Sequence, residues 1–226
     1  MTRALGLLVA LLLLALPATA AARTLVGTPG KDRLVGGDSG NVINGDGGGD
    51  VIIGGAGVDR LLGEWGGDDL YGRGGDDYLD GSSGGDTIDG AAGNDQILGG
   101  FGGDDILAGE GDDFVDGGPA GDDIDGGAGN DVIHGGTATD RIKGGIGNDT
   151  IYSDSGGDLI DAGEGDDTVY GGEGDDTLGG QRGWDVLSAG PGDDALDGGG
   201  GPDHHEGGEG SNTCALGAGD TENACG

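Results

Sequence analysis

Aspartate recurs at every ninth residue along most of the chain, and this spacing is the feature that could do chemistry. Taken in register from Gly27 to Ala215, a nine-residue unit repeats 21 times without insertion or deletion. Its sixth position is Asn41 in the second copy, Asn212 in the last copy and aspartate in all others. Evenly spaced carboxylate oxygens are ligands for hard cations, above all calcium. The candidate metal ligands are therefore Asp32, Asp50, Asp59, Asp68, Asp77, Asp86, Asp95, Asp104, Asp113, Asp122, Asp131, Asp140, Asp149, Asp158, Asp167, Asp176, Asp185, Asp194 and Asp203.

Glycine and one bulky aliphatic residue complete the unit, which reads Gly-Gly-x-Gly-x-Asp-x-U-x and is seen clearly at residues 99–107. The U position is Leu, Ile or Val from Leu34 to Leu196, and it then changes to His205 and Cys214. Glycine at positions one, two and four permits positive φ and lets backbone carbonyls turn toward a ligand. The unit therefore combines a glycine-rich turn, a carboxylate and one core residue.

The elements that position these aspartates follow from the period. Positions one to six are expected to form a turn, and positions seven to nine a three-residue strand that places U between two outward residues. Two turns and two strands close a coil of 18 residues, with neighbouring coils about 4.8 Å apart. The sequence predicts an all-β parallel β-roll, a right-handed β-solenoid, over residues 27–215, with residues 23–26 as a lead-in.

This nonapeptide resembles the hemolysin-type, or RTX, calcium-binding repeat, and the resemblance covers residues 27–215. It implies a β-roll in which calcium sits between successive turns on one edge, held by position-six carboxylates and backbone carbonyls. If each ion needs two turns, the two edges offer 10 and 9 sites, or about 19 calcium ions in all. The chain departs from the family in its N-terminal signal, where an uncleaved C-terminal one is usual, and in having no catalytic or pore-forming domain before the repeats. We therefore expect a stand-alone, exported bacterial repeat array.

The predicted core is too thin to hold the coil by itself. A buried Ile or Leu contributes roughly 1.5 to 3 kcal/mol, whereas fixing nine residues costs about 1 to 2 kcal/mol each in backbone entropy. Unneutralised carboxylates stacked about 5 Å apart add repulsion. We therefore expect a roll that calcium stabilises and a metal-free chain that is expanded or disordered.

Composition excludes several classes of function. The chain has 63 glycines, 44 acidic residues and a net charge of -35, which excludes ordinary electrostatic binding to nucleic acid. We find no Ser/His/Asp or Cys/His constellation and expect no enzyme. His204 and His205 are neighbours on a predicted strand and point to opposite faces, so they do not chelate one ion together. Two interpretations remain for these histidines. One of them binds zinc, or both are ordinary imidazoles that bind no metal and are exposed or partly buried.

Both ends of the chain indicate export. Residues 1–22 have the pattern of a secretory signal peptide, with Arg3, an apolar stretch over residues 4–16 and expected cleavage after Ala20 or Ala22. The alternative is an uncleaved anchor, but 13 apolar residues fall short of the roughly 20 that span a bilayer, and no transmembrane segment is expected after cleavage. A secreted, extracellular chain permits a disulfide between Cys214 and Cys225 that closes a cap over residues 216–226; two free thiols are the alternative.

A second role is left open by the outer faces of the strands. At position seven the even-numbered copies offer the less charged set Val42, Arg60, Tyr78, Gln96, Phe114, Val132, Thr150, Thr168 and Val186. An adhesive or partner-binding stripe and ordinary strand propensity both account for this face.

Overall fold

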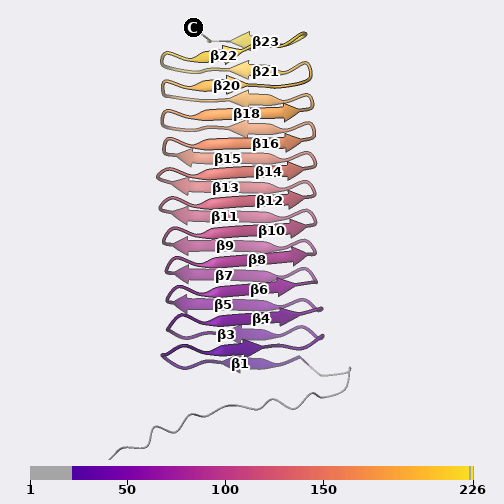
Figure 1. Ribbon diagram of the computed structural model, residues 1–226, viewed down its shortest axis with the longest axis vertical. Coiled ribbons are helices and arrows are strands. Elements are labelled where there is room, and N and C mark those ends of the chain that lie inside the picture. The colour runs from indigo at the N-terminus through magenta and orange to yellow at the C-terminus, as the bar shows by residue number, and fades with distance from the viewer. Residues whose placement is uncertain (1–21, 224, 226) are drawn as a thin grey trace, which may run out of the picture.

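The computed structural model describes residues 22–223 and 225, and in these residues the chain forms one continuous β-solenoid without a helix (Figure 1). The alternation of outward and inward residues predicted from the repeat continues from coil to coil. The strands are β1 (Thr24–Val26), β2 (Arg33–Val35), β3 (Val42–Asn44), β4 (Val51–Gly55), β5 (Arg60–Trp65), β6 (Asp69–Arg73), β7 (Tyr78–Ser83), β8 (Thr87–Ala92), β9 (Gln96–Phe101), β10 (Asp105–Glu110), β11 (Phe114–Pro119), β12 (Asp123–Ala128), β13 (Val132–Thr137), β14 (Arg141–Ile146), β15 (Thr150–Ser155), β16 (Leu159–Glu164), β17 (Thr168–Tyr170), β18 (Thr177–Arg182), β19 (Val186–Ser188), β20 (Ala195–Asp197), β21 (His204–Glu206), β22 (Thr213–Ala215) and β23 (Thr221–Asn223).

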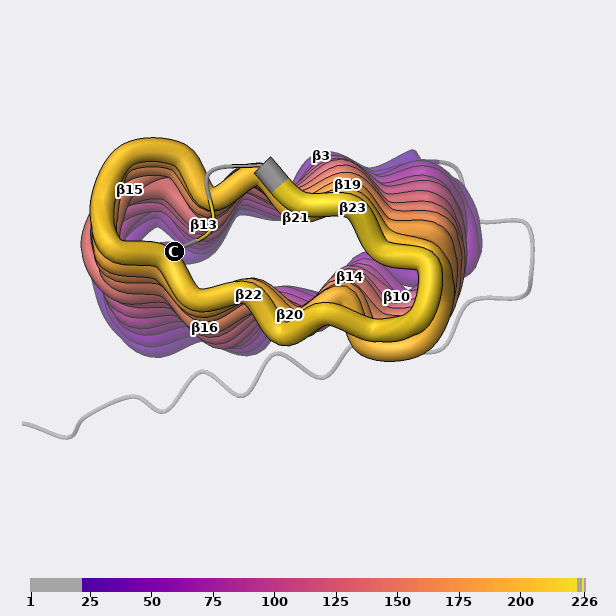
Figure 2. Tube along the Cα trace, turned by 90° about the horizontal axis from the view of Figure 1, so that it is seen from above, coloured from indigo at the N-terminus to yellow at the C-terminus, as the bar shows by residue number. Residues whose placement is uncertain are grey.

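Two parallel sheets face each other across a narrow interior. The odd-numbered strands form a 12-stranded sheet, here the first sheet, and the even-numbered strands form an 11-stranded second sheet. Within a sheet, partners are 18 residues apart, as in Ile106↔Ile124 and Ile106↔Ile88. The near strands in Figure 1 run to the right and the paler far strands run back as the chain climbs, so the solenoid is right-handed. The view along the axis shows the flattened coils with a turn at each edge (Figure 2). The predicted fold class and coil length are confirmed.

The strands are longer than predicted through the middle of the roll. β10, for example, covers six residues, Asp105 to Glu110, and so includes the first three positions of the next repeat. The expectation of three-residue strands was wrong because position one also faces inward and continues the alternation. Only small residues fit there, and where the residue is not glycine it is the buried Ala108, Ser153, Ala162 or Ala189. The turn is confined to positions four to six.

The core is a double row of U-position aliphatics, buried from Ile43 to Leu196. Leu25 and Leu34 at one end and Cys214 at the other are only partly buried against this row. At the C-terminal end His205 occupies a U position and is fully buried. The aliphatic row therefore ends at Leu196, and the last two U positions hold a histidine and a cysteine.

Stacked turns explain the glycine at position four. Gly102 has φ +129°, and a Cβ at this residue would lie 1.4 Å from the carbonyl oxygen of Gly84 in the preceding coil. At the spacing between these two coils no side chain fits so close to a backbone oxygen. Ala120 and Ala138 fill the same position in the next two coils, also with positive φ, +103° and +84°.

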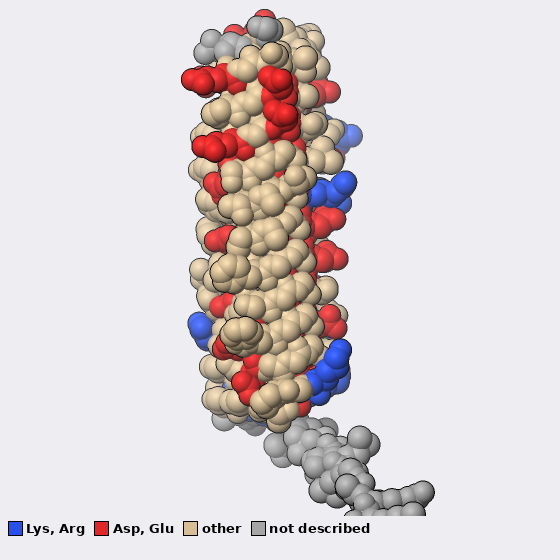
Figure 3. Space-filling view, turned by 90° about the vertical axis from the view of Figure 1, so that its left-hand side faces the viewer, with Lys and Arg blue, Asp and Glu red and all other residues tan. Residues whose placement is uncertain are grey.

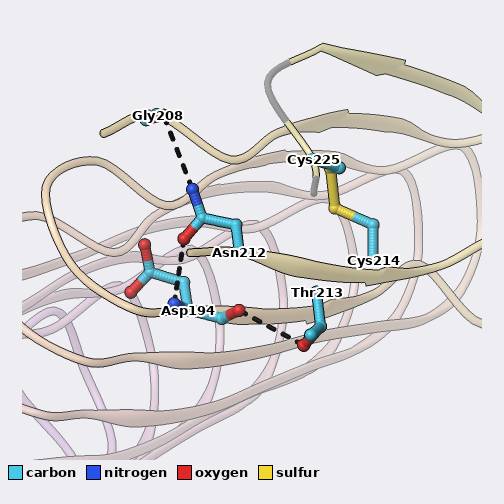
Figure 4. Close-up of a disulfide and its surroundings, with 6 residues drawn as sticks. All are labelled: Asp194, Gly208, Asn212, Thr213, Cys214 and Cys225. Carbon is cyan, nitrogen blue, oxygen red and sulfur yellow. Dashed lines mark hydrogen bonds between the residues drawn. A yellow bond between two sulfur atoms is a disulfide. The ribbon is translucent and has the colours of Figure 1, made fainter. Parts of the chain in front are cut away.

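Each end of the roll carries one more strand than the repeats alone predict. The lead-in forms β1, which pairs with β3, and the C-terminal segment forms β23, which pairs with β21. The disulfide predicted between Cys214 and Cys225 is present and ties this last segment to β22 (Figure 4). Asn212 supports the same end, since its Oδ1 accepts a hydrogen bond from the Asp194 amide at 2.9 Å.

The predicted signal peptide, residues 1–22, lies outside the described residues except for Ala22. Among the residues described, no helix is long and apolar enough to cross a membrane.

Candidate metal centre

The position-six side chains point into the roll and form a ladder along each edge. From Asp50 to Asp203 every one of these aspartates is at most 3% exposed. One carboxylate oxygen accepts a hydrogen bond from the position-six amide of the preceding coil: Asp86 N donates to Asp104 Oδ1 at 2.8 Å, and Asp104 N donates to Asp122 Oδ1 at 2.8 Å. The structure thus aligns the predicted ligands in two files, joined coil to coil.

The second oxygen of each carboxylate has no partner. Oδ2 is buried and makes no hydrogen bond in every position-six aspartate from Asp50 to Asp203. Asp32 differs, because it is partly exposed and its Oδ2 accepts hydrogen bonds from Thr28 N and Oγ1 at 2.6 and 2.8 Å. Buried polar atoms are almost always paired, and an unpaired buried charge is costly. A file of unpaired buried carboxylate oxygens is therefore a place for cations.

A backbone carbonyl oxygen lies beside many of the unpaired oxygens. At Gly99 the atoms nearest to the position of an added Cβ are Asp104 Oδ2 and the carbonyl oxygen of Gly117, both at 2.6 Å. The same pair of atom types surrounds position one at Gly45, Gly63 and Gly180. Carboxylate and carbonyl oxygens from adjacent coils thus converge, and such all-oxygen sets suit calcium.

Burial raises the pKa of these carboxyl groups, and neighbouring aspartates often raise it further. Desolvation is the largest cause, while the hydrogen bond from the backbone amide acts in the opposite direction. The pKa is raised to about 7 in Asp77, Asp113, Asp122 and Asp149. It is raised to about 6 in Asp86, Asp95, Asp104, Asp131, Asp140, Asp176 and Asp185. A bound dication would favour the charged carboxylates and so lower their pKa values again.

Basic side chains do not supply the missing positive charge. In the described part of the chain, the ion pairs join exposed or half-exposed groups on the outer faces, such as Lys143 and Asp125 at 3.6 Å, and none involves a position-six aspartate. Compensation therefore falls to protons or to bound cations, and the position-six carboxylates with the position-one carbonyls would hold the cations.

A ladder at position five was not predicted from the sequence. On the edge that follows the even-numbered strands, the amides from Asn94 to Trp184 donate to the side chain one coil earlier, as in Asp112 N to Asn94 Oδ1 at 3.0 Å and Asn130 N to Asp112 Oδ1 at 2.8 Å. Asp193 and Ser211 make the same bond near the C-terminal end of the opposite edge. The signal in the sequence was the Asp or Asn that often precedes the position-six aspartate. The opposite edge has glycine at this position in Gly67, Gly85, Gly103 and Gly121. Figure 3 looks onto that edge, which is mostly free of acidic side chains except at its margins and upper end.

Asp220 was also missed, because it lies beyond the regular repeats. Its Oδ1 accepts a hydrogen bond from Asp203 N at 3.1 Å, across 17 residues instead of 18. The signal was the sequence Gly217-Ala218-Gly219-Asp220, a degenerate turn one residue short of the period.

Comparison with known proteins agrees with this geometry. The profile of the RTX calcium-binding nonapeptide repeat matches in overlapping segments that together run from residue 26 to residue 221. No curated protein matches the chain. Repeats of this family bind calcium in a β-roll and are generally non-catalytic. A period of 18 residues per coil, inward aspartates with an unpaired oxygen and the profile match over most of the sequence show that this chain belongs to the RTX calcium-binding nonapeptide repeat family.

Proposed function

We propose that this protein is an exported calcium-binding protein whose repeat array folds when it binds the metal. The observation that carries the proposal is the file of buried, unpaired Oδ2 atoms from Asp50 to Asp203. Without cations this arrangement places uncompensated carboxylates in the interior, so the energy of calcium binding is also folding energy.

The number of ions follows from the pairing of adjacent turns. About 19 dications would bring about +38 of charge. The chain after residue 22 has a charge of -36, because only Arg3 of its nine basic residues lies earlier. This near balance supports calcium as the structural counter-charge of the roll. The partly exposed Asp32 and the altered C-terminal coil support fewer filled sites at the ends.

Export and a structural, surface-associated role outside a bacterial cell belong to the same proposal. The apolar N-terminal segment over residues 4–16 supports export. The disulfide between Cys214 and Cys225 is consistent with an oxidising environment. Extracellular calcium would then be available to the chain only after it had left the cell.

The test is far-ultraviolet circular dichroism of the chain, titrated with calcium from a chelated start and repeated with magnesium. We expect a cooperative, calcium-specific rise in β signal from a coil-like baseline. A spectrum that is already rich in β structure in chelator, and that calcium leaves unchanged, would refute metal-coupled folding.

A second candidate function is adhesion through the outer face of the first sheet. One observation favours it: His134, Tyr152 and Tyr170 stack in successive coils with ring centroids 4.7 and 4.9 Å apart. Phe114 extends the row at 5.9 Å from His134. The row is half-buried at Phe114, His134 and Tyr152 and exposed at Tyr170, and accessible aromatic side chains are enriched in binding surfaces.

Pull-down with intact cells separates the two functions. A double variant, Tyr152→Lys with Tyr170→Lys, should abolish cell binding and leave the calcium titration unchanged if the face is adhesive. Equal capture of wild type and variant would exclude this face, and the calcium-binding role would stand alone.

A further inference from the structure

We infer that the C-terminal end of the roll holds a site for one transition-metal dication of the zinc type, formed by Asp203, the last aspartate of the position-six file, with His205 and Asp220. One ligand atom from each of these side chains lies within 4.8 Å of the other two. The inference goes beyond calcium binding by the repeats, because it depends on a nitrogen donor that the other coils lack.

His205 is the unusual member of the core row. It is the only histidine at a U position, its exposed fraction is 0%, and neither of its ring nitrogens has a hydrogen-bond partner. His204, its neighbour on β21, is exposed, and its Nδ1 lies 2.8 Å from Thr221 Oγ1. The two histidines face opposite sides as predicted, so His205 alone is available to an interior ion.

The donor set changes at this coil. At Gly180, one coil earlier, Asp185 Oδ2 and the carbonyl oxygen of Gly198 lie 2.4 and 2.8 Å from the position of an added Cβ. At Gly198 the corresponding neighbours are Asp203 Oδ2 at 2.4 Å and His205 Nε2 at 2.6 Å. An imidazole nitrogen thus stands in place of the carbonyl oxygen, and a nitrogen–oxygen set suits zinc and its neighbours better than calcium.

Asp203 and Asp220 complete the site from two adjacent coils. Asp203 is 2% exposed and its Oδ2 has no partner. The carboxylate of Asp220 is oriented by Asp203 N and by Gly217 N, both of which donate to it. The disulfide between Cys214 and Cys225 spans the loop that carries Asp220 and so fixes this ligand near β21.

The arrangement has the features of a zinc site with an open position. Three protein ligands leave a fourth position for water, as in many zinc sites. Metal–ligand bonds of about 2.0 to 2.2 Å place ligand atoms about 3.5 Å apart, so the three side chains close slightly onto the ion.

The experiment measures Co2+ and Zn2+ binding to the full chain in excess calcium, by the visible absorption of Co2+ and by calorimetry with Zn2+. We expect one transition-metal ion per chain that excess calcium does not displace. His205→Leu should weaken this binding by at least about 10- to 100-fold, the range that loss of an outer-shell partner alone produces. Leucine occupies the same position in Leu187 and Leu196, so the variant should keep the calcium-loaded β spectrum.

Two further variants make the test specific. His204→Gln removes the exposed neighbour and should bind Co2+ as wild type does, whereas Asp220→Asn should weaken binding. Absence of a calcium-resistant ion, unchanged binding by His205→Leu, or equal loss in His204→Gln would overturn the site. None of these outcomes affects the calcium titration that tests the proposed function.

Discussion

The two oxygens of each position-six aspartate have different roles. Oδ1 is a structural acceptor that joins one coil to the preceding one, as in the bond from Asp86 N to Asp104. Oδ2 is buried without a partner beside a carbonyl oxygen of the next coil. One residue type therefore serves both the backbone ladder and the cation, which explains why the position varies so little along the chain.

Asp104→Asn separates these roles, because the amide keeps an oxygen for Asp86 N but loses the charge. We expect the midpoint of the calcium titration to rise about 10-fold, equivalent to about 1.4 kcal/mol, with the β-roll still formed at saturating calcium. The measurement is calcium binding followed by calorimetry and circular dichroism.

Asp105→Asn is the matched control, since Asp105 is the exposed neighbour on the same strand. It should leave the midpoint within about twofold of wild type. Equal midpoints for both variants would show that Asp104 is not a ligand.

At the scale of the turn, glycine sets the distance between coils. Position four combines a left-handed backbone with direct contact to the carbonyl of the preceding turn, whereas position three at Gly74 leaves room for a side chain. Glycines at positions three and four thus differ in how much space they leave for a side chain and in the backbone conformation that they adopt. The difference depends on the stacking of coils and not on the turn alone.

Gly102→Ala should destabilise the calcium-loaded roll by about 1 to 3 kcal/mol, the cost of strain at positive φ, because Ala120 and Ala138 already fill this position in the next two coils. The added Cβ would lie 1.4 Å from Gly84 O, and the coil must open to admit it. Urea unfolding in saturating calcium measures the effect.

Gly74→Ala serves as the control, because its nearest neighbour would be Ala92 O at 3.7 Å and its φ is not positive. We expect a change within about 0.5 kcal/mol. A similar loss in both variants would mean that position four is not sterically restricted.

Across the whole molecule, protons and calcium compete for the same buried carboxylates. In the metal-free roll the pKa of many position-six aspartates is raised to about 6 or 7, against about 3.9 in an unfolded chain. The folded metal-free chain therefore binds more protons than the unfolded chain between these pH values. Its stability is greatest below about pH 4 and is lost as pH rises toward 7.

In chelator, the chain should accordingly gain β signal when the pH is lowered from 8 to about 4.5. In saturating calcium the signal should already be complete at pH 8, because the ions neutralise the carboxylates. Circular dichroism against pH, with and without calcium, tests this. Loss of β signal on acidification in chelator would contradict the raised pKa values.

Most of the architecture was predictable because every nine-residue unit repeats the same pattern of glycine, aspartate and aliphatic residues. The nine-residue period determined the β-roll, the 18-residue coil, the inward file from Asp50 to Asp203 and the U-position core. The spacing and location of Cys214 and Cys225 indicated the disulfide. These features depend on which side of the chain a residue faces, and the period alone determines that.

Only the tertiary structure decided what depends on contacts between coils or on a break in the period. Three such features depend on contacts between residues 18 positions apart in the sequence. They are the extension of β10 through Glu110, the different roles of the two carboxylate oxygens of Asp104, and the position-five ladder. Asp220 meets Asp203 across a shortened step of 17 residues, beside the buried His205. The nine-residue period predicts the positions of residues within the regular repeats. Residues beyond the last regular repeat are positioned by packing, by the disulfide and by the last pair of strands.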